Sequence, residues 1–285
     1  MGEKWQELYS DSDIKKIQEI ELDSLTVFSD LCKKLNIEYY LYGGSMLGAI
    51  KYNGFVPWDD DLDIALMRHD YDKLIKEGPS LLPDDYELQE PSINKITPYP
   101  YIKFRRKDTT MVEYAAYRLK MNHGVYFDVY PIDNIPDDEE LYKHQHRKLQ
   151  RLVRIFLLRQ RGGLTRPVTS LRLFLKAVIK YSIYCMLQFI PHDYLVSKMY
   201  NTMVAYNNIT TKRQGNYFYP RAVNYFDGIL PAVEVLFEMR KEKIPKGYEV
   251  NLRNRYGDYS ILPPEDQRIG HRPYILEIGG YNVNR

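Results

Sequence analysis

Apolar residues near the N-terminus recur with the period of an α-helix. From Asp11 to Leu35 they return every three or four residues, which predicts a helix with one buried face. Ser10 or Asp11 can cap its first turn. A short apolar strand at 38–42 then leads into a glycine turn, and 45–51 has the pattern of a short helix.

Strand patterns dominate the next part of the chain, and helical patterns dominate the part after it. Strands are predicted at 61–67, 86–89, 99–105, 110–114 and 124–130, with a helix at 70–76 after the first of them. Pro131 is expected to end the last strand. Helices are predicted at 137–160, 167–189, 192–208 and 246–256, followed by an irregular tail. The 285-residue chain is therefore predicted to be an α+β protein, with a mixed sheet in residues 1–135 and a largely helical region in 136–285.

The first predicted strand carries two aspartates. Because side chains alternate along a strand, Asp61 and Asp63 share one face while Leu62 and Ile64 point to the core. Two adjacent carboxylates repel each other and are costly to remove from water, and a divalent cation between them removes that cost. The Gly-Gly-Ser turn at 43–45 adds backbone N–H groups that can approach a phosphate. The pattern indicates metal-assisted chemistry on a phosphate ester.

A third carboxylate completes such a site if a later strand lies beside the first. Asp128 is the candidate, because it lies in an apolar strand pattern where an unpaired carboxylate is costly; a capped or turn-bonded Asp128 is the alternative. Lys103 and Arg105 share a strand face and can meet phosphate oxygens, although plain exposed strand charges fit equally well. Trp58 is expected to pack at the start of the strand, and contact with the head group of a phosphate-ester substrate is the alternative.

Other acidic residues nearby are given different roles. Asp59 and Asp60 are expected to be solvated or to support the neighbouring carboxylates, with Asp59 as a further ligand the alternative. Asp133 precedes Asn134 and is expected to lie in a turn.

The net charge is only +2, but the charged residues are distributed unevenly along the chain. Residues 141–192 contain 11 Lys and Arg and no acidic residue, whereas the rest of the chain carries 29 basic and 38 acidic residues. The cations alternate with apolar residues, which is typical of a helix lying on an anionic membrane surface. A solvated helix face is the default alternative, although such faces usually mix signs. Nucleic acid ranks last, because no base-reading motif accompanies the charge.

Composition narrows the compartment and the class of protein. The N-terminus lacks the apolar segment of a secretory signal, and no run of ~18 uncharged apolar residues occurs. Cys32 and Cys185 form neither a metal-binding pair by spacing nor a disulfide framework. A cytoplasmic protein is expected, peripheral on the inner face of the plasma membrane if the basic helices bind there. The 27 Tyr against 10 Phe fit AT-rich coding, and an aromatic box for a quaternary ammonium is the alternative.

Three blocks of the chain resemble one family. The segment YGGSMLGAIKYNGFVPWDDDLDIAL resembles the defining segment of the LicD family, within the nucleotidyltransferase superfamily and related to fukutin-type phosphotransferases. YFDVYPID at 126–133 resembles that family's second acidic strand, and RYGDYSILPPEDQRIGH at 255–271 resembles its C-terminal signature. The basic segment carries no signature of the family. The resemblance implies a nucleotidyltransferase-like mixed-sheet core with flanking helices and a C-terminal segment that completes the site.

The resemblance also implies a reaction. A CDP-linked alcohol, such as CDP-choline, would donate its phospho-alcohol group to a sugar hydroxyl of a cell-surface glycan or its lipid-linked precursor, and CMP would leave. Lipopolysaccharide and teichoic acid are acceptors of this kind. The implied site residues are Asp61, Asp63 and Asp128 for Mg²⁺ or Mn²⁺, Gly43, Gly44 and Ser45 for the donor phosphates, and His271 for a phosphate contact or proton transfer.

Other functions remain open at this point. A nucleotidyltransferase that attacks an NTP and releases pyrophosphate would need the same acidic strand. A non-enzymatic membrane-surface protein would need only the basic helices, and a metal-dependent glycosyltransferase with an Asp-x-Asp motif fits the preceding glycines poorly. The donor head group is also undetermined, with choline, ethanolamine, glycerol and ribitol as the candidates.

Overall fold

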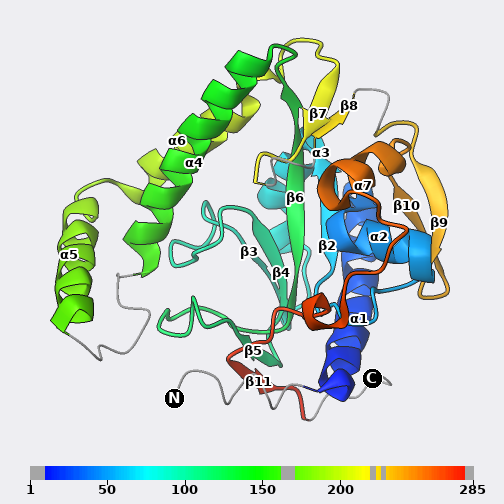
Figure 1. Cartoon of the computed structure of the whole chain (residues 1–285), viewed down its shortest axis with the longest axis horizontal. Coiled ribbons are helices and arrows are strands. Elements are labelled where there is room, and N and C mark those ends of the chain that lie inside the picture. The colour runs from blue at the N-terminus through cyan, green and yellow to red at the C-terminus, as the bar shows by residue number, and fades with distance from the viewer. Residues whose placement is uncertain (1–9, 162–170, 219–222, 226–228, 280–285) are drawn as a thin grey trace.

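A mixed β-sheet forms the centre of the molecule (Figure 1). The computed structural model describes residues 10–161, 171–218, 223–225 and 229–279. The strands of the sheet are β1 (Tyr39–Leu41), β2 (Asp63–Met67), β3 (Tyr86–Gln89), β4 (Ile102–Arg106), β6 (Tyr126–Ile135), β7 (Arg213–Gly215) and β8 (Val223–Tyr225). They run in the order β1–β2–β6–β4–β3, and β7 and β8 extend the sheet from the far end of β6. Among the described pairs, only β2 and β6 run parallel.

Helices and two small strand pairs surround this sheet. The helices are α1 (Asp11–Leu35), α2 (Gly43–Tyr52), α3 (Arg68–Glu77), α4 (Glu139–Arg161), α5 (Leu171–Leu187), α6 (His192–Met203) and α7 (Tyr248–Tyr256), with short 3₁₀ turns η2 (Gly78–Ser80), η3 (Val204–Tyr206) and η5 (Glu265–Gln267). The strand pairs are β9 (Val233–Phe237) with β10 (Arg240–Ile244), and β5 (Thr110–Val112) with β11 (Ile275–Glu277). The second pair joins the C-terminal part of the chain to the sheet region.

Helix α1 packs its apolar side against one face of the sheet. Ser10 caps the helix through a capping box with Asp13. Phe28 makes edge-to-face contacts with Phe104 of β4 and Phe127 of β6, each with ring centroids 5.3 Å apart. All three rings are fully buried, and burial of one such side chain contributes ~1.5–3 kcal/mol. The predicted amphipathic helix and its cap are confirmed.

Helices α4 and α6 form a separate layer beside the far end of β6 (Figure 1). Their buried side chains, including Leu149, Phe156, Met199 and Met203, pack with Ile135 of β6. Helix α5 stands at the outer end of α4, away from the sheet. The predicted α+β fold with a mixed sheet and flanking helices is confirmed, whereas the division near residue 135 stays a prediction.

Strand β6 is longer than the sequence predicted. It continues through Pro131 to Ile135, so the expectation that Pro131 ends the strand was wrong. Pairing with β4 stops at Val129, and pairing with β7 begins at Asp133. Pro131 lies between these two pairings. Its lack of an N–H therefore removes no hydrogen bond from either antiparallel pair.

The strands of the second region were not predicted. Strands β7 to β11 have only three to five residues each, which is too short for a period-two signal. Two of them also have partners far away in the sequence, as β7 pairs with β6 and β11 pairs with β5. Pro167, the predicted start of the second long helix, lies outside the described residues.

Candidate active site

Two parallel strands bring the three predicted carboxylates together. The register places Asp63 of β2 opposite Asp128 of β6. Asp61 lies in the loop before β2, because the strand begins two residues later than predicted. One carboxylate oxygen from each of the three residues lies within 4.8 Å of the other two. The predicted convergence of Asp61, Asp63 and Asp128, here called the acid cluster, is confirmed.

The acid cluster contains buried carboxylate oxygens that the described protein leaves without hydrogen-bond partners. Among the described residues, Oδ1 of Asp61 and Oδ1 of Asp63 are buried without a hydrogen-bond partner. Burial raises the pKa of Asp61 well above its usual range, and repulsion from Asp63 and Asp128 adds to the shift. Burial also raises the pKa of Asp63, opposed by Arg255 and the Gly44 N–H. An all-oxygen donor set with unsatisfied buried charge fits a hard divalent cation such as Mg²⁺.

Asp128 is held from both sides. The Lys103 ammonium donates to its Oδ1 at 2.8 Å, and the Tyr130 hydroxyl donates to its Oδ2 at 2.8 Å. Lys103 is buried and lies 3.3 Å from the ring centroid of Tyr126, a cation–π contact. Contacts of this kind fix the orientation of a ligating carboxylate. Lys103, predicted for phosphate, is thus engaged with Asp128, and its contact with a phosphate stays a prediction.

The Gly-Gly-Ser segment supports Asp63. Helix α2 begins at Gly43, whose φ is +51° and where a Cβ would lie 2.0 Å from Oδ2 of Asp63, so only glycine fits. The Gly44 N–H donates to Oδ2 of Asp63 at 2.8 Å, and the Asp63 N–H donates to the Ser45 hydroxyl at 2.7 Å. The start of α2 therefore orients a carboxylate of the acid cluster. That Gly43, Gly44 and Ser45 also hold donor phosphates stays a prediction.

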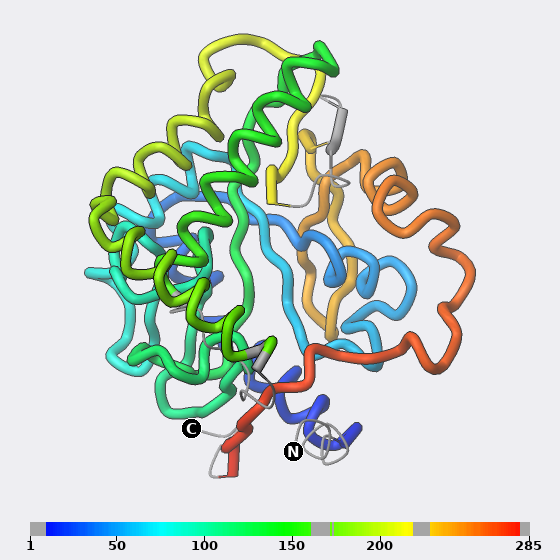
Figure 2. Tube along the Cα trace, turned by 60° about the vertical axis from the view of Figure 1, so that its left-hand side comes forward, coloured from blue at the N-terminus to red at the C-terminus, as the bar shows by residue number. Residues whose placement is uncertain are grey.

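The C-terminal segment reaches the site through Asp60. This buried carboxylate accepts the backbone N–H groups of His271 at 2.6 Å and Arg272 at 3.3 Å. The His271 ring places Nδ1 3.2 Å from Asp60 and Nε2 3.8 Å from Oδ2 of Asp61. Figure 2 shows this segment passing beside the chain that enters β2. The predicted nearness of His271 to the acidic strand is therefore a fact of the structure, and Asp60 is what holds it there.

Two of these groups have strongly altered proton affinity. The hydrogen bond with Asp60, reinforced by Asp61, raises the pKa of His271 to about 10. Burial raises the pKa of Asp59 to about 7, opposed by His271 and reinforced by Asp63. Asp59, Asp60 and His271 also converge within 4.8 Å, but Asp60 is already committed to His271 and Arg272. The ring of His271 is about half exposed, so its Nε2 edge can face a substrate.

Sequence reasoning missed two residues of this site. Arg255 of α7 lies with Nη2 4.0 Å from Oδ2 of Asp63, and its position at the start of the C-terminal block was a usable signal. Glu21 of α1 is fully buried, and neither of its oxygens has a hydrogen-bond partner among the described residues. Burial and then the nearby aspartates raise its pKa well above the usual range. A charged residue on the apolar face of α1, next to Ile20, was the signal for Glu21.

Two predicted residues have partners outside the acid cluster. Arg105 is buried and donates to Oε1 of Gln89 at 2.9 Å and to the Gly124 carbonyl at 2.7 Å. No hydrogen bond from Arg105 to the acid cluster occurs in the described chain, so we leave it out of the proposed site. Trp58 is partly buried beneath the Arg268 guanidinium, which lies 5.2 Å from its ring centroid. A role for Trp58 in holding a head group stays a prediction.

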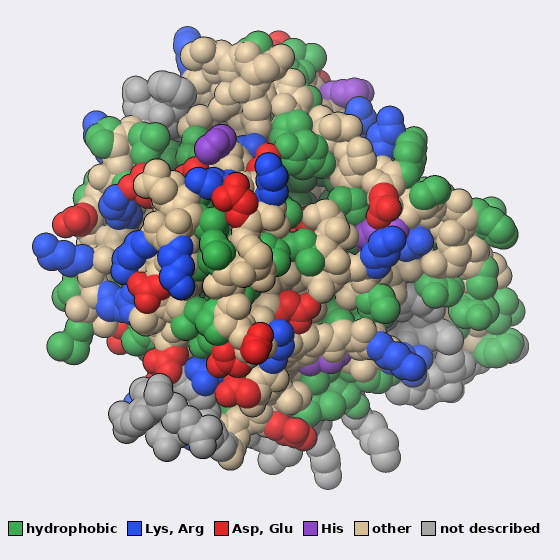
Figure 3. Space-filling view, turned by 180° about the vertical axis from the view of Figure 1, so that it is seen from behind, with side chains coloured by type: hydrophobic (Ala, Val, Ile, Leu, Met, Phe, Trp, Pro, Cys, Tyr) green, Lys and Arg blue, Asp and Glu red, His purple; other side chains and the backbone are tan. Residues whose placement is uncertain are grey.

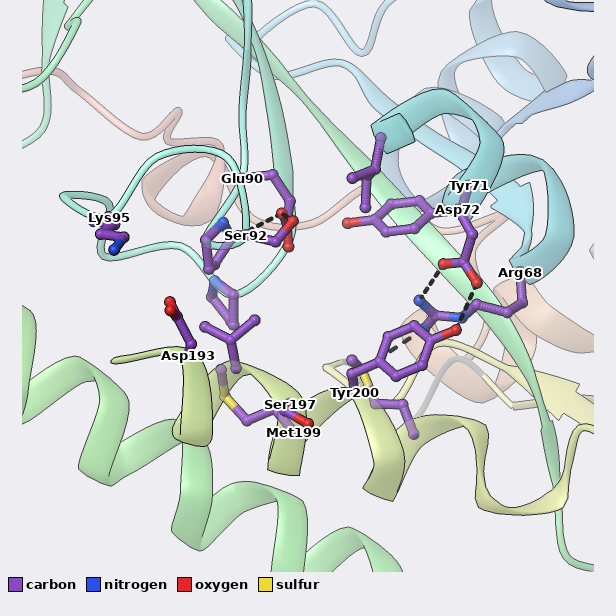
Figure 4. Close-up of a pocket in the computed structure, with 15 residues that line it drawn as sticks. Arg68, Tyr71, Asp72, Glu90, Ser92, Lys95, Asp193, Ser197, Met199 and Tyr200 are labelled. Atoms are coloured by element: carbon purple, nitrogen blue, oxygen red, sulfur yellow. Dashed lines mark hydrogen bonds and ion pairs between the residues drawn. The ribbon is translucent and has the colours of Figure 1, made fainter. Parts of the chain in front are cut away.

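A cavity of about 520 Å³ lies between α3, α6 and the β3–β4 connection (Figure 4). Arg68 projects beside it, between the rings of Tyr71 and Tyr200. Its guanidinium donates to both oxygens of Asp133, at 2.7 and 2.6 Å, and to Asp72 at 3.3 Å. Burial alone would lower the pKa of Arg68, but the Asp133 carboxylate raises it overall. The expectation that Asp133 lies in a turn was wrong, because β6 continues past it and Arg68 binds it.

Comparisons with known proteins match the part of the chain that contains the acid cluster. Residues 36–152 match the family described as LicD/FKTN/FKRP, nucleotidyltransferase domain. The chain is 24% identical over 281 residues, covering 92% of this chain and 98% of the relative, to the lipopolysaccharide cholinephosphotransferase LicD of Haemophilus influenzae. An uncharacterised protein of Rickettsia typhi is 36% identical over 67 residues, 21% of this chain and 22% of that protein. Another from Rickettsia prowazekii is 35% identical over 74 residues, 24% of this chain and 28% of that protein.

Proposed function

The chain carries a nucleotidyltransferase domain of the LicD family and is a phosphotransferase, and from this premise we propose that it transfers phosphocholine to a hydroxyl group of a glycan. The observation that carries the proposal is the acid cluster, in which three carboxylates converge and two of their buried oxygens have no hydrogen-bond partner among the described residues. The name of the Haemophilus relative supports choline phosphate as the group and lipopolysaccharide as the class of acceptor.

The finer proposal is that the donor is CDP-choline and that CMP leaves. A nucleotidyltransferase domain suits a nucleotide-linked donor. In the reaction, the acceptor oxygen forms a new bond to the phosphorus of phosphocholine while the bond from that phosphorus to CMP breaks. The acceptor proton passes to a base or to solvent. Phosphoryl transfer of this kind depends mainly on positioning and on charge neutralisation.

Mg²⁺, or Mn²⁺ in its place, would be held by Asp61, Asp63 and Asp128 and would neutralise charge on the donor diphosphate. The surrounding residues fix these ligands in advance. Lys103 and Tyr130 orient Asp128, and the start of α2 orients Asp63 through the Gly44 N–H. Preorganised ligands and donors avoid reorganisation during the reaction.

Two further cations border the acid cluster and would contact the donor diphosphate. Arg255 reaches it from α7, with Nη2 4.0 Å from Asp63. His271 reaches it from the C-terminal segment, anchored through Asp60 with its Nε2 edge toward Asp61. Guanidinium and imidazolium groups form strong, charge-assisted hydrogen bonds with phosphate oxygens. We therefore assign His271 to phosphate contact rather than to proton transfer.

Product analysis tests the proposal. Purified protein with Mg²⁺ is given a panel of CDP-choline, CDP-ethanolamine, CDP-glycerol and CDP-ribitol with a saccharide acceptor, and CMP release and phosphorylated glycan are measured. We expect CMP and phosphocholine-glycan from CDP-choline, with turnover by Asp61→Asn lowered roughly 10³-fold and full turnover by the exposed control Asp30→Asn. Release of pyrophosphate from an NTP, with no CMP from any CDP-alcohol, would replace the proposal with nucleotidyl transfer, which the family description also suits.

A further inference from the structure

Helix α5 exposes apolar side chains around much of its surface. Seven of them are between 38% and 70% exposed: Phe174, Leu175, Val178, Ile179, Tyr181, Ile183 and Met186. Phe189, just after the helix, is 90% exposed. The view from behind shows hydrophobic side chains gathered at the edge of the molecule where α5 projects (Figure 3). Exposed apolar clusters of this size usually mark an interaction surface.

The charges on α5 have a single sign, and those of the adjacent helix α4 after Glu140 share it. The charged residues of α5 are Arg172, Lys176 and Lys180, all exposed, and the helix contains no acidic residue. The adjacent helix α4 adds a basic cleft of about 410 Å³ lined by His144, Arg147, Lys148, Arg151 and Leu152. Outside residues 141–192 the chain has more acidic than basic residues. An anionic surface would therefore attract this side of the molecule and repel the remainder.

We propose that α5 lies in the interface of an anionic lipid bilayer, with its apolar side chains among the acyl chains and its lysines at the headgroups. Within the described residues, no helix is long and apolar enough to cross a membrane. The three cations spread along α5 favour an orientation in the plane of the surface. Interleaved cations and large apolar residues without acids are the composition of such interfacial helices.

A second copy of the chain is a poorer occupant for this surface. A symmetric contact through α5 would bring two copies of Arg172, Lys176 and Lys180 together without an acidic partner on the helix, and like charges at an interface disfavour association. The bilayer proposal does not depend on the proposed reaction. If both hold, membrane contact would bring the enzyme to a lipid-linked saccharide acceptor.

Vesicle flotation without donor or acceptor tests the proposal on the full chain. We expect wild type to float with vesicles that contain phosphatidylglycerol and to stay unbound with pure phosphatidylcholine. Ile179→Glu combined with Met186→Glu should abolish flotation, because both side chains would carry charge into the acyl region. The matched control Leu236→Glu, an exposed apolar residue of β9 on the opposite side of the molecule from α5 (Figure 1), should float like wild type.

A charge series separates lipid binding from self-association. Changing Arg172, Lys176 and Lys180 to Gln one at a time should weaken partitioning about fivefold per cation. Turnover on a water-soluble acceptor should not change in any α5 variant, which checks the fold. The proposal is overturned if wild type fails to float with the vesicles that contain phosphatidylglycerol. It is also overturned by a dimer, seen by light scattering, that the Ile179→Glu and Met186→Glu pair dissolves while flotation stays the same.

Discussion

The two ends of the β2–β6 strand pair bury carboxylates in opposite ways. At the end where both strands begin, Asp63 and Asp128 converge with Asp61, and buried oxygens lack partners among the described residues. At the other end, Asp133 is equally buried but binds the Arg68 guanidinium through both oxygens. A buried carboxylate with both oxygens bound by a protein cation supports the fold, whereas a carboxylate cluster with buried oxygens that lack partners indicates a site for a ligand.

The large cavity lies at the end of the strand pair where the buried charges are paired. About 520 Å³ of space adjoins Arg68, where the charges are already satisfied. Large pockets are the usual first guess for an active site, but here the buried carboxylate oxygens without partners lie at the other end of the strands. For chemistry on a diphosphate, unsatisfied carboxylates are the more informative feature.

The largest expected effect is on catalysis at the unsatisfied end. Asp61→Asn removes one ligand from the acid cluster and should lower kcat/KM roughly 10³-fold, the loss expected when several kcal/mol of charge stabilisation disappears. In EDTA the same change should leave the free energy of unfolding equal or higher, because it removes a repelling charge. Urea unfolding with and without EDTA checks this. A large loss of stability in EDTA would mean that Asp61 has a structural role.

At the Arg68 end of the β2–β6 pair, a substitution is expected to affect stability instead of catalysis. Arg68→Met leaves Asp133 buried without its guanidinium and should lower the free energy of unfolding by about 3–5 kcal/mol. Turnover per folded molecule, measured well below the unfolding midpoint, should stay close to wild type. A normal unfolding midpoint with lost turnover would reverse the roles assigned to the two ends.

Divalent cation should stabilise the protein through the acid cluster alone. At 100 times its dissociation constant, Mg²⁺ should raise the free energy of unfolding by about 2.7 kcal/mol. Thermal unfolding should show this increase in wild type and in Arg68→Met, and should show none in Asp61→Asn. An equal increase in Asp61→Asn would place the cation elsewhere.

A smaller effect is expected from the groups that orient the ligands. Tyr130→Phe removes the hydroxyl that donates to Asp128 and should weaken Mn²⁺ affinity about 10-fold, as loss of such a contact commonly does. Paramagnetic titration measures the affinity. Tyr194→Phe, an exposed tyrosine of α6, is the matched control and should bind Mn²⁺ like wild type.

The smallest effect is a pH trend in the metal-free protein. Burial raises the folded-state pKa of Asp59 to about 7. The folded protein therefore binds this proton more tightly than the unfolded chain does, which stabilises the fold at low pH. That contribution to the free energy of unfolding is lost as pH rises through about 7. His271, raised to about 10 by Asp60, adds a loss in the same direction at higher pH. Unfolding in EDTA should therefore show stability falling from pH 5 to pH 8. A free energy of unfolding that rises from pH 5 to pH 8 would contradict the raised pKa of the buried Asp59 carboxyl.

The acid cluster could be predicted because local pattern and strand pairing act together. Strand alternation suggested that Asp61 and Asp63 face the same way, although Asp61 lies in the loop before β2. One Asp128 in an apolar strand pattern was enough to suggest a neighbouring strand. The contacts that complete the site could not be derived from spacing. Asp60 and His271 are 211 residues apart, and only the resemblance to a known family suggested that the C-terminal block reaches the site.

The structural charges were harder to predict than the site. Arg68 and Asp133 bind each other because β6 runs past Pro131 and places Asp133 beside the first turn of α3. That continuation depends on which strands pair on either side of Pro131, and a single sequence does not reveal this. Arg105 was likewise assigned to phosphate from its strand face, although its partners Gln89 and Gly124 come from other segments.

Anomalous scattering from crystals grown with Mn²⁺ and CDP-choline tests the central claim most directly. We predict a manganese peak about 2.0–2.6 Å from oxygens of Asp61, Asp63 and Asp128, and no peak beside Arg68 and Asp133. Bound donor without manganese at the acid cluster, or manganese only at the Arg68 end, would contradict the account.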